Sequence, residues 1–250
     1  MNPQETLMVD GADYEVLERA VVDVLDVEGA IVEIGVRMGG SVKIMIDALA
    51  ANESARDRLV IAIDPYGDIP YPSTNKSVAC QEVVGRSFEA RTYPIVGDPM
   101  STDVVIGDVH HDYDNDMRNY FLPSLYWYAF NDGVNLQFLQ LEDTEYMDRF
   151  PDGFPTYVNG VKRIVDRYAL TFFDGPHTTD AVMREAVFFG SRTSAGGALV
   201  FDDPWMYDHE RVDGVVREFG FELLECPQLL DTCHVSKVSY RRKSMKGTKR

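Results

Sequence analysis

Acidic side chains follow five apolar runs of the sequence, and carboxylates at such places could bind a cofactor or a metal. The positions are Glu33, Asp64, Glu142 with Asp143, Asp174, and Asp202 with Asp203. Carboxylate oxygens accept hydrogen bonds from hydroxyl and ammonium groups, and they are the hard ligands that Mg²⁺ prefers. If the runs are parallel strands of one sheet, their carboxyl ends share an edge, where ligands of doubly wound folds bind. The acids are then expected to converge on one site.

The segment from Glu33 to Ser41, EIGVRMGGS, has the composition of a turn that approaches a ligand closely. Gly35 and Gly39 lack a Cβ and let the backbone bend sharply beside a bound molecule. The segment departs from the dinucleotide pattern G-x-G-x-x-G, because Arg37 stands where the second glycine should be. A glutamate two residues before Gly35 favours a cationic amino-acid group over a pyrophosphate. A plain strand-to-helix turn is the alternative.

Asp64 ends the next apolar run, and a carboxylate at that place can accept both hydroxyls of a ribose. The alternative is that Asp64 only turns the chain before Pro65. Glu33 and Asp64 together are more specific than either residue alone.

The elements that must position these acids follow from hydrophobic periodicity. Strands are expected at 30–35, 59–63, 136–141, 168–173 and 198–201, with weaker ones at 220–225 and 233–240. Helices are expected at 14–25, 158–168 and 208–219. Two more are expected with a cap at their start: one runs from Ser41 through 49, and the other runs from Thr178 or Thr179 through 189 and is closed by Gly196-Gly197. This alternation predicts an α/β fold, a doubly wound and mostly parallel seven-stranded sheet. The rhythm breaks over about 67–133, which we interpret as an inserted cap segment of a single domain spanning 1–240.

The charge of the chain limits its partners. Its 250 residues carry a formal net charge of −17, although six basic residues fall in the last ten, 241–250. Such an acidic body repels nucleic acids and anionic membrane surfaces, and the basic tail 241–250 is expected to be disordered. Three cysteines, an odd number without a C-x-x-C pair, favour a reduced cytoplasmic location. No run is long enough for a membrane helix.

Four motifs occur in an order that resembles a known family: E-x-G-x-x-x-G-G-S at 33–41, D-P-Y-G at 64–67, D-G-x-H at 174–177, and G-G-x-x-x-x-D-D at 196–203. Together they resemble the class I S-adenosylmethionine-dependent methyltransferases. The likeness is greatest to the macrocin O-methyltransferase-type branch, which acts on sugars and other small molecules. It covers about 30–66 and 134–240, but not 67–133, and it implies a Rossmann-like methyltransferase fold.

The resemblance also implies roles for the acids. Contacts to S-adenosylmethionine would come from Glu33, Gly35, Gly39, Ser41, Asp64, Glu142, Asp143 and Asp174, with Asp64 on the ribose and Glu142-Asp143 near the adenine. A divalent metal, usually Mg²⁺, would be held by Asp174, Asp202 and Asp203. Such an ion could bind a substrate diol and lower the pKa of a hydroxyl. The alternative for Asp202 and Asp203 is that only one of them faces the site.

The catalytic residues implied by the resemblance are Asp174 and His177. Some relatives have an aspartate that acts as the general base at the position of Pro176. His177 is therefore the candidate base in this chain, because imidazole titrates near neutral pH. A helix cap or a hydrogen bond to a strand end is the alternative for His177. The aromatic residues Tyr126, Trp127, Tyr128 and Phe130 either line the substrate pocket or form the core of the insertion, and we favour the core.

The sequence therefore predicts transfer of a methyl group to a hydroxyl of a small polar acceptor. The sequence does not fix the oligomeric state, but the resemblance is to enzymes that are often homo-oligomers. A cofactor-binding protein without catalysis and a methyltransferase of proteins are the alternatives. A nicotinamide-dependent oxidoreductase is disfavoured by the missing glycine pattern.

Overall fold

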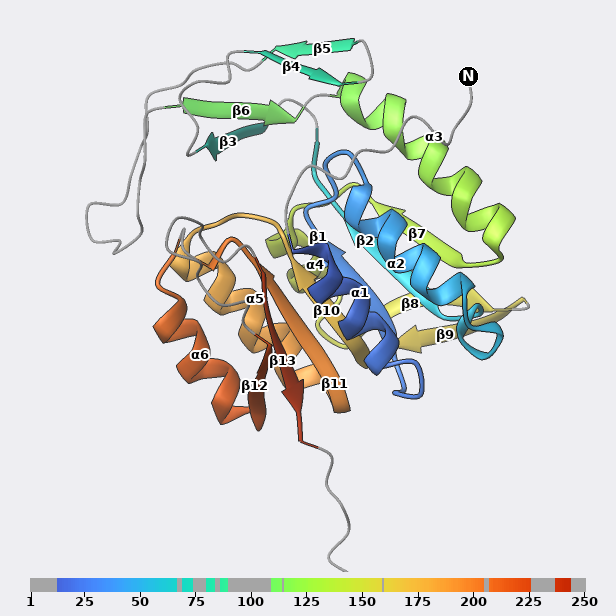
Figure 1. Ribbon diagram of the computed structural model, residues 1–250, viewed down its shortest axis with the longest axis vertical. Helices are drawn as coiled ribbons and strands as arrows, with labels where there is room; N and C mark the ends of the chain where they lie inside the picture. Colours follow the sequence, from blue (N-terminus) through green and yellow to red (C-terminus); the bar gives the residue numbers. More distant parts are fainter. Residues whose placement is uncertain are drawn as a thin grey trace, which may run out of the picture.

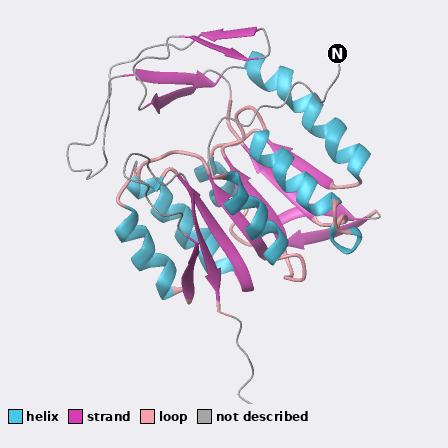
Figure 2. Cartoon of the chain, viewed as in Figure 1, coloured by secondary structure: helices cyan, strands magenta, loops and turns pink. Residues whose placement is uncertain are grey.

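The computed structural model places a seven-stranded sheet between two layers of helices (Figures 1 and 2). It describes residues 13–66, 69–73, 80–83, 86–89, 109–113, 115–158, 160–204, 207–225 and 237–243. Predictions for Cys226 and Cys233, for most of the insertion and for the tail beyond 243 lie outside these residues. Among the described residues, no helix is long and apolar enough to cross a membrane.

The sheet has the strand order β12-β13-β11-β10-β1-β2-β7. Its parallel strands are β1 (Ala30–Ile34), β2 (Leu59–Ile63), β7 (Asn135–Leu139), β10 (Tyr168–Phe173) and β11 (Thr193–Asp202). The antiparallel strand β13 (Lys237–Arg242) lies between β11 and β12 (Phe221–Glu225). This topology confirms the predicted doubly wound, mostly parallel sheet.

Helices cover both faces of the sheet. One face is covered by α1 (Tyr14–Asp23), α2 (Gly40–Ala50) and α3 (Asn115–Asp132); the other is covered by α4 (Asp143–Arg149), α5 (Thr179–Arg192) and α6 (His209–Glu218). Successive side chains of a strand point to opposite faces. Ile31 accordingly packs with α1 and α2, whereas Val32 packs with α5. A 3₁₀ turn, η2 (Glu53–Ala55), joins α2 to β2.

Three two-stranded ribbons lie outside the main sheet: β3 (Ile69–Ser73) with β6 (Val109–Tyr113), β4 (Cys80–Val83) with β5 (Arg86–Glu89), and β8 (Phe154–Val158) with β9 (Val161–Val165). The first two belong to the predicted insertion, for which the described backbone gives only these strands and α3.

The helix predicted at 158–168 is wrong, because the chain forms the hairpin of β8 and β9 there. Val158, Val161 and Val165 have spacings that a helix would also allow. Asn159-Gly160 between two runs rich in β-branched residues is, however, the strongest short hairpin signal. Gly160 has a φ of 77°, a conformation that favours glycine.

Two boundaries near the sheet also differ from expectation. Gly196-Gly197 does not close α5 but lies inside β11, which begins at Thr193. Strand β13 continues through Arg242, two residues into the tail predicted to begin at 241, and Arg241 forms a 2.8 Å ion pair with Asp23.

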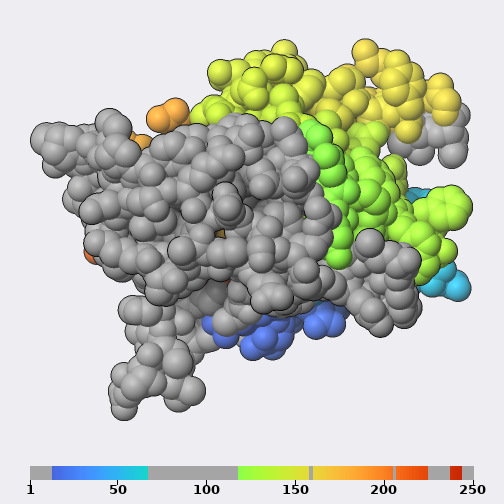
Figure 3. Space-filling model, turned by 90° about the horizontal axis from the view of Figure 1, so that it is seen from above, coloured from blue at the N-terminus to red at the C-terminus, as the bar shows by residue number. Residues whose placement is uncertain are grey.

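The four aromatic residues predicted to line a pocket or to form the core of the insertion lie on α3. Tyr128 packs into the core shared with α1 and α2, while Tyr126, Trp127 and Phe130 are exposed. Part of α3 is visible in green on the surface in Figure 3. The expectation of an insertion with its own core is therefore wrong for Tyr128, because this helix completes the main core.

Gly35 has no room for a side chain. Its φ is 86°, and an added Cβ would lie 1.9 Å from the backbone oxygen of Asp174 at the end of β10. Gly133 shares the left-handed conformation, with a φ of 70°, but a Cβ there would meet nothing within 4 Å. A side chain at Gly133 would therefore cause only conformational strain, whereas a side chain at Gly35 would cause the same strain and also a clash between two strand ends.

We expect Gly133→Ala to lower the free energy of unfolding by about 1–2 kcal/mol, the cost of a left-handed alanine. Gly35→Ala should cost clearly more, because the ends of β1 and β10 must also move apart. Urea denaturation of both variants measures the difference. Equal losses would show that the close approach at Gly35 has no energetic weight.

Candidate functional site

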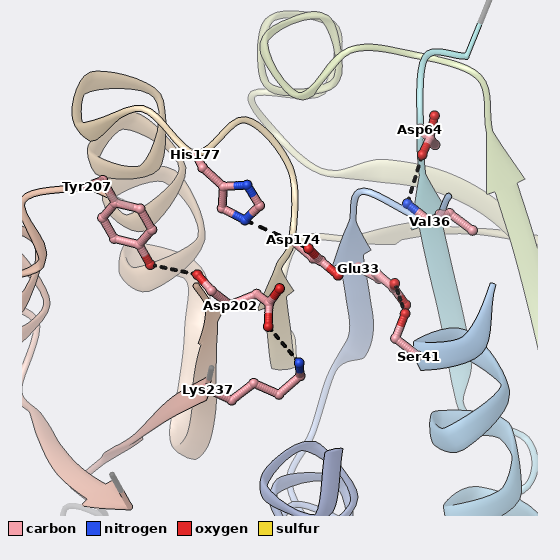
Figure 4. A network of polar contacts seen from close by, with 9 residues as sticks. All are labelled: Glu33, Val36, Ser41, Asp64, Asp174, His177, Asp202, Tyr207 and Lys237. Atoms are coloured by element: carbon pink, nitrogen blue, oxygen red, sulfur yellow. Dashed lines mark hydrogen bonds and ion pairs between the residues drawn. The ribbon is translucent and has the colours of Figure 1, made fainter. Parts of the chain in front are cut away.

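The carboxyl edge of the parallel strands carries a cluster of acids on one face of the sheet (Figure 4). Side chains two residues apart on a strand share a face. Glu33 follows Ile31 and Asp202 follows Val200 at this spacing, and both apolar residues face α1 and α2. Asp174 extends β10 at the same edge. The two-residue period therefore brings these three carboxylates together.

Glu33 is fully buried in the cluster, with one oxygen left over. Its Oε1 accepts a short hydrogen bond from the Ser41 hydroxyl, whereas Oε2 has no hydrogen-bond partner among the described residues. Burial raises the pKa of Glu33 well above its usual range. Ser41 is therefore not the predicted helix cap, since α2 begins at Gly40 after the left-handed Gly39. An orphaned buried acceptor such as Oε2 is a place for a cationic donor.

Asp64 holds the glycine turn in shape. Its Oδ2 accepts the amides of Val36 and Arg37 at 2.8 and 2.9 Å, and its Oδ1 accepts the amide of Tyr66 at 2.9 Å. Arg37 and Tyr66 both have left-handed backbones, with φ of 45° and 42°. Burial raises the pKa of Asp64, and the three amides oppose that rise. Asp64 can hold the turn and also accept a hydrogen bond from a ribose, because a carboxylate has about four acceptor positions.

Asp174, His177 and Asp202 form a compact group whose potential ligand atoms lie within 4.8 Å of one another. His177 Nε2 lies 3.8 Å from Asp174 Oδ1. Burial raises the pKa of Asp174 well above its usual range, and the neighbouring Asp202 raises it further. Burial lowers the pKa of His177, which favours the neutral imidazole. Asp203, the third predicted ligand, is not part of this group and has a left-handed backbone.

A lysine that the sequence analysis missed completes the cluster. Lys237 is fully buried, and its Nζ lies 2.6 Å from Asp202 Oδ1. The register of β11 and β13 pairs these two residues directly. The available signal was alternation in β13, where Lys237 and Ser239 face away from Val238 and Tyr240. Lys237 therefore lies on the same face of the sheet as the carboxylates.

The described residues do not fit a divalent metal in the place that the resemblance implies. Asp202 already binds the Lys237 ammonium, and Asp203 is outside the group. A metal on the same carboxylate, with its bonds of about 2.1 Å, would lie on the order of 5 Å from Nζ. At an effective dielectric constant of about 20, a unit and a divalent charge then repel by about 7 kcal/mol. The predicted magnesium site is therefore disfavoured while Lys237 is present.

The acids after β7 have different surroundings. Glu142 caps α4 in a capping box with Glu145 and is exposed. Asp143 faces Glu185 of α5, which is fully buried. Burial raises the pKa of Glu185 well above its usual range, with the charge of Asp143 adding to the rise. Glu185 was also missed, although it lies in the apolar stripe of α5 between Val182 and Phe189.

Comparisons with known proteins address the family and the fold of the chain. The family model described as "Macrocin-O-methyltransferase (TylF)" matches residues 5–92, which include Glu33, the glycine turn and Asp64. No curated protein matches the chain.

Among solved structures, the O-methyltransferase NovP has 21% identity and a TM-score of 0.51, with 92% of this chain and 79% of that chain covered. The calicheamicin methyltransferase CalS11 has 16% identity and a TM-score of 0.52, with 92% and 78% covered. Its apo structure is described as a TDP-rhamnose 3'-O-methyltransferase. These similarities establish the Rossmann-like methyltransferase fold. Together with the family match, they confirm the predicted resemblance and support a methyltransferase.

The buried Glu185 gives the stability of the protein a predictable pH dependence. A carboxyl whose pKa is higher in the folded than in the unfolded state costs stability as the pH rises from about 4, its unfolded value, through the folded pKa. Glu185→Gln removes this cost, and each unit of raised pKa corresponds to about 1.4 kcal/mol.

The advantage of Glu185→Gln over the original protein should therefore be larger at pH 8 than at pH 5 in urea denaturation. The exposed Glu222 on β12 provides the control, since Glu222→Gln should show no such trend. An advantage that stays constant between the two pH values would contradict the proposed cause.

Proposed function

We propose that the chain transfers a methyl group from S-adenosylmethionine to a hydroxyl of a small polar molecule. The observation that carries the proposal is the buried Oε2 of Glu33, which has no hydrogen-bond partner in the part of the chain that the structure describes and precedes the left-handed Gly35. A cationic amino group would satisfy this oxygen.

The described residues fit this cofactor. Glu33 and the turn from Gly35 to Gly39 would hold its methionine part, and Asp64 would bind the ribose hydroxyls. Glu142 and Asp143 follow the next strand and would lie near the adenine. When bound, S-adenosylmethionine supplies a methyl group on a positively charged sulfur.

His177 would take up the proton of the acceptor hydroxyl. Its ring lies parallel to that of Tyr207, with 6.5 Å between centroids, and Tyr207 donates a hydrogen bond to the backbone oxygen of Asp202. The lowered pKa of His177 keeps the imidazole neutral, as a base must be, while Asp174 would stabilise the imidazolium that forms. Transfer of the methyl carbon to the acceptor oxygen would leave the electrons of the sulfur–carbon bond on sulfur, and His177 would take the proton of the hydroxyl.

The acceptor is inferred from charge and likeness. Residues 98–152 contain twelve acids against Arg118 and Arg149, which favours a neutral or cationic acceptor over a phosphorylated one. The similarity to CalS11, described as a TDP-rhamnose 3'-O-methyltransferase, supports a sugar hydroxyl, although the acidic segment favours a sugar without the diphosphate of that acceptor. The alternative is a protein that binds the cofactor without catalysis. A turnover assay distinguishes the two, because only an enzyme would form product.

Calorimetry with S-adenosylmethionine and S-adenosylhomocysteine tests the cofactor assignment. We expect both to bind, and Glu33→Gln to weaken binding about 10- to 100-fold, because a hydrogen bond to a charged group contributes about 1.5–3 kcal/mol. Glu222→Gln, on the surface of β12, is the matched control and should bind normally. Absence of binding at millimolar concentration would refute the proposal.

The role of His177 requires a separation of binding from turnover. We expect His177→Gln to bind S-adenosylmethionine normally but to form S-adenosylhomocysteine about 10²–10⁴-fold more slowly with a sugar-bearing acceptor. A panel of neutral glycosides, followed by release of S-adenosylhomocysteine, serves to find that acceptor. Unchanged turnover in the variant would leave His177 with only a structural role.

A further inference from the structure

Lys237 is a fully buried cation beside the acidic cluster. Removing an ammonium from water is unfavourable unless it is paired and its hydrogen bonds are satisfied. Its Nζ lies 2.6 Å from Asp202 Oδ1, and the direct pairing of the two residues across β11 and β13 fixes this contact. The register of the two strands therefore fixes the position of the ammonium, which lacks the freedom of a flexible side chain on the surface.

The surroundings of Lys237 extend its influence beyond Asp202. Its Nζ lies 4.0 Å from the centre of the Tyr14 ring and 5.6 Å from that of Phe172, where ring faces attract a cation. Its charge also lowers the pKa of Glu33 and of Asp174, against the larger rise that burial causes. One ammonium thus acts on three carboxylates from three neighbouring strands.

We propose that the Lys237 ammonium is the built-in cation of this site and supplies the positive charge that a divalent metal would otherwise bring, so that methyl transfer needs no metal. The proposal rests on the proposed function, since it concerns the same cluster. Lys237 is a positioning residue, because its buried Nζ acts through Asp202. By binding Oδ1 it fixes the orientation of the Asp202 carboxylate within the group that Asp202 forms with Asp174 and His177.

The ammonium has a second consequence for the site. Asp174, His177 and Asp202 have the donor atoms and the spacing of a metal site, with ligand atoms within 4.8 Å of one another. Lys237 supplies the positive charge that this donor set would otherwise draw from solution. Removing the ammonium while keeping the donors should therefore create an affinity for divalent ions.

Manganese binding tests this directly and does not depend on activity. The full chain is titrated with MnCl₂, and paramagnetic resonance follows the free ion. We expect no binding to the original protein below millimolar concentration, and at least about tenfold tighter binding to Lys237→Met, which keeps the length of the side chain. Lys162→Met, at an exposed position of β9, is the matched control and should leave manganese free.

Micromolar manganese binding by the original protein that Asp174→Asn abolishes would overturn the proposal, and so would no gain of binding in a folded Lys237→Met. If Lys237→Met does not fold, the titration of the original protein still decides the matter. The double variant Lys237→Met/Asp202→Asn removes both charges and should recover stability without gaining manganese binding, so a gain in it would also contradict the proposal.

Turnover distinguishes this proposal from the proposed function. If the chain methylates an acceptor, chelation by EDTA should leave the rate unchanged, and Lys237→Arg should keep more activity than Lys237→Met. Loss of activity with EDTA would refute the built-in cation but not the methyltransferase. Absence of S-adenosylmethionine binding would refute the methyltransferase, while the manganese titration would still report on Lys237.

Discussion

Buried negative charge at one edge of the sheet is the constraint on which the rest of the site depends. A carboxylate removed from water is stable only with donors or a cation nearby. The chain meets this need differently at each position: backbone amides serve Asp64, a hydroxyl of α2 serves Glu33, and the ammonium of Lys237 serves Asp202. Each solution also orients the carboxylate, so the compensation of charge and the geometry of the site have the same origin.

The two-residue period of the strands links this site to the core. The same alternation that places Ile31 and Val200 against α1 and α2 places Glu33 and Asp202 on that face one step further along. A shift of one residue in either strand would turn an acid into the opposite layer, among the side chains of α5 and α6. The apolar packing of the two layers therefore fixes the register that the acids require.

The sequence predicted the central strands, their parallel order and the acids at their ends, because buried apolar runs followed by carboxylates are local patterns. It failed where the pairing of strands decides the structure, whether the partner strand is near or distant in the sequence. The segment 158–168 has a helix-like spacing, yet it takes part in the hairpin of β8 and β9. Lys237 was missed because its meaning depends on the register with β11, which no local pattern specifies. The proposed roles of Glu33, Asp174 and His177 remain predictions.

The contacts of Lys237 join segments that are far apart along the chain. Its ammonium meets the ring of Tyr14 on the first described helix and the carboxylate of Asp202 on β11. During synthesis, β1, β10 and β11 leave the ribosome before β13. Asp202 therefore has no ion pair with Lys237 until β13 has been made. The site can therefore reach its final charge only when the last strand has entered between β11 and β12. The insertion of β13 therefore completes the sheet and neutralises Asp202 in the same late step of folding. This step depends on contacts between residues that are far apart in the sequence.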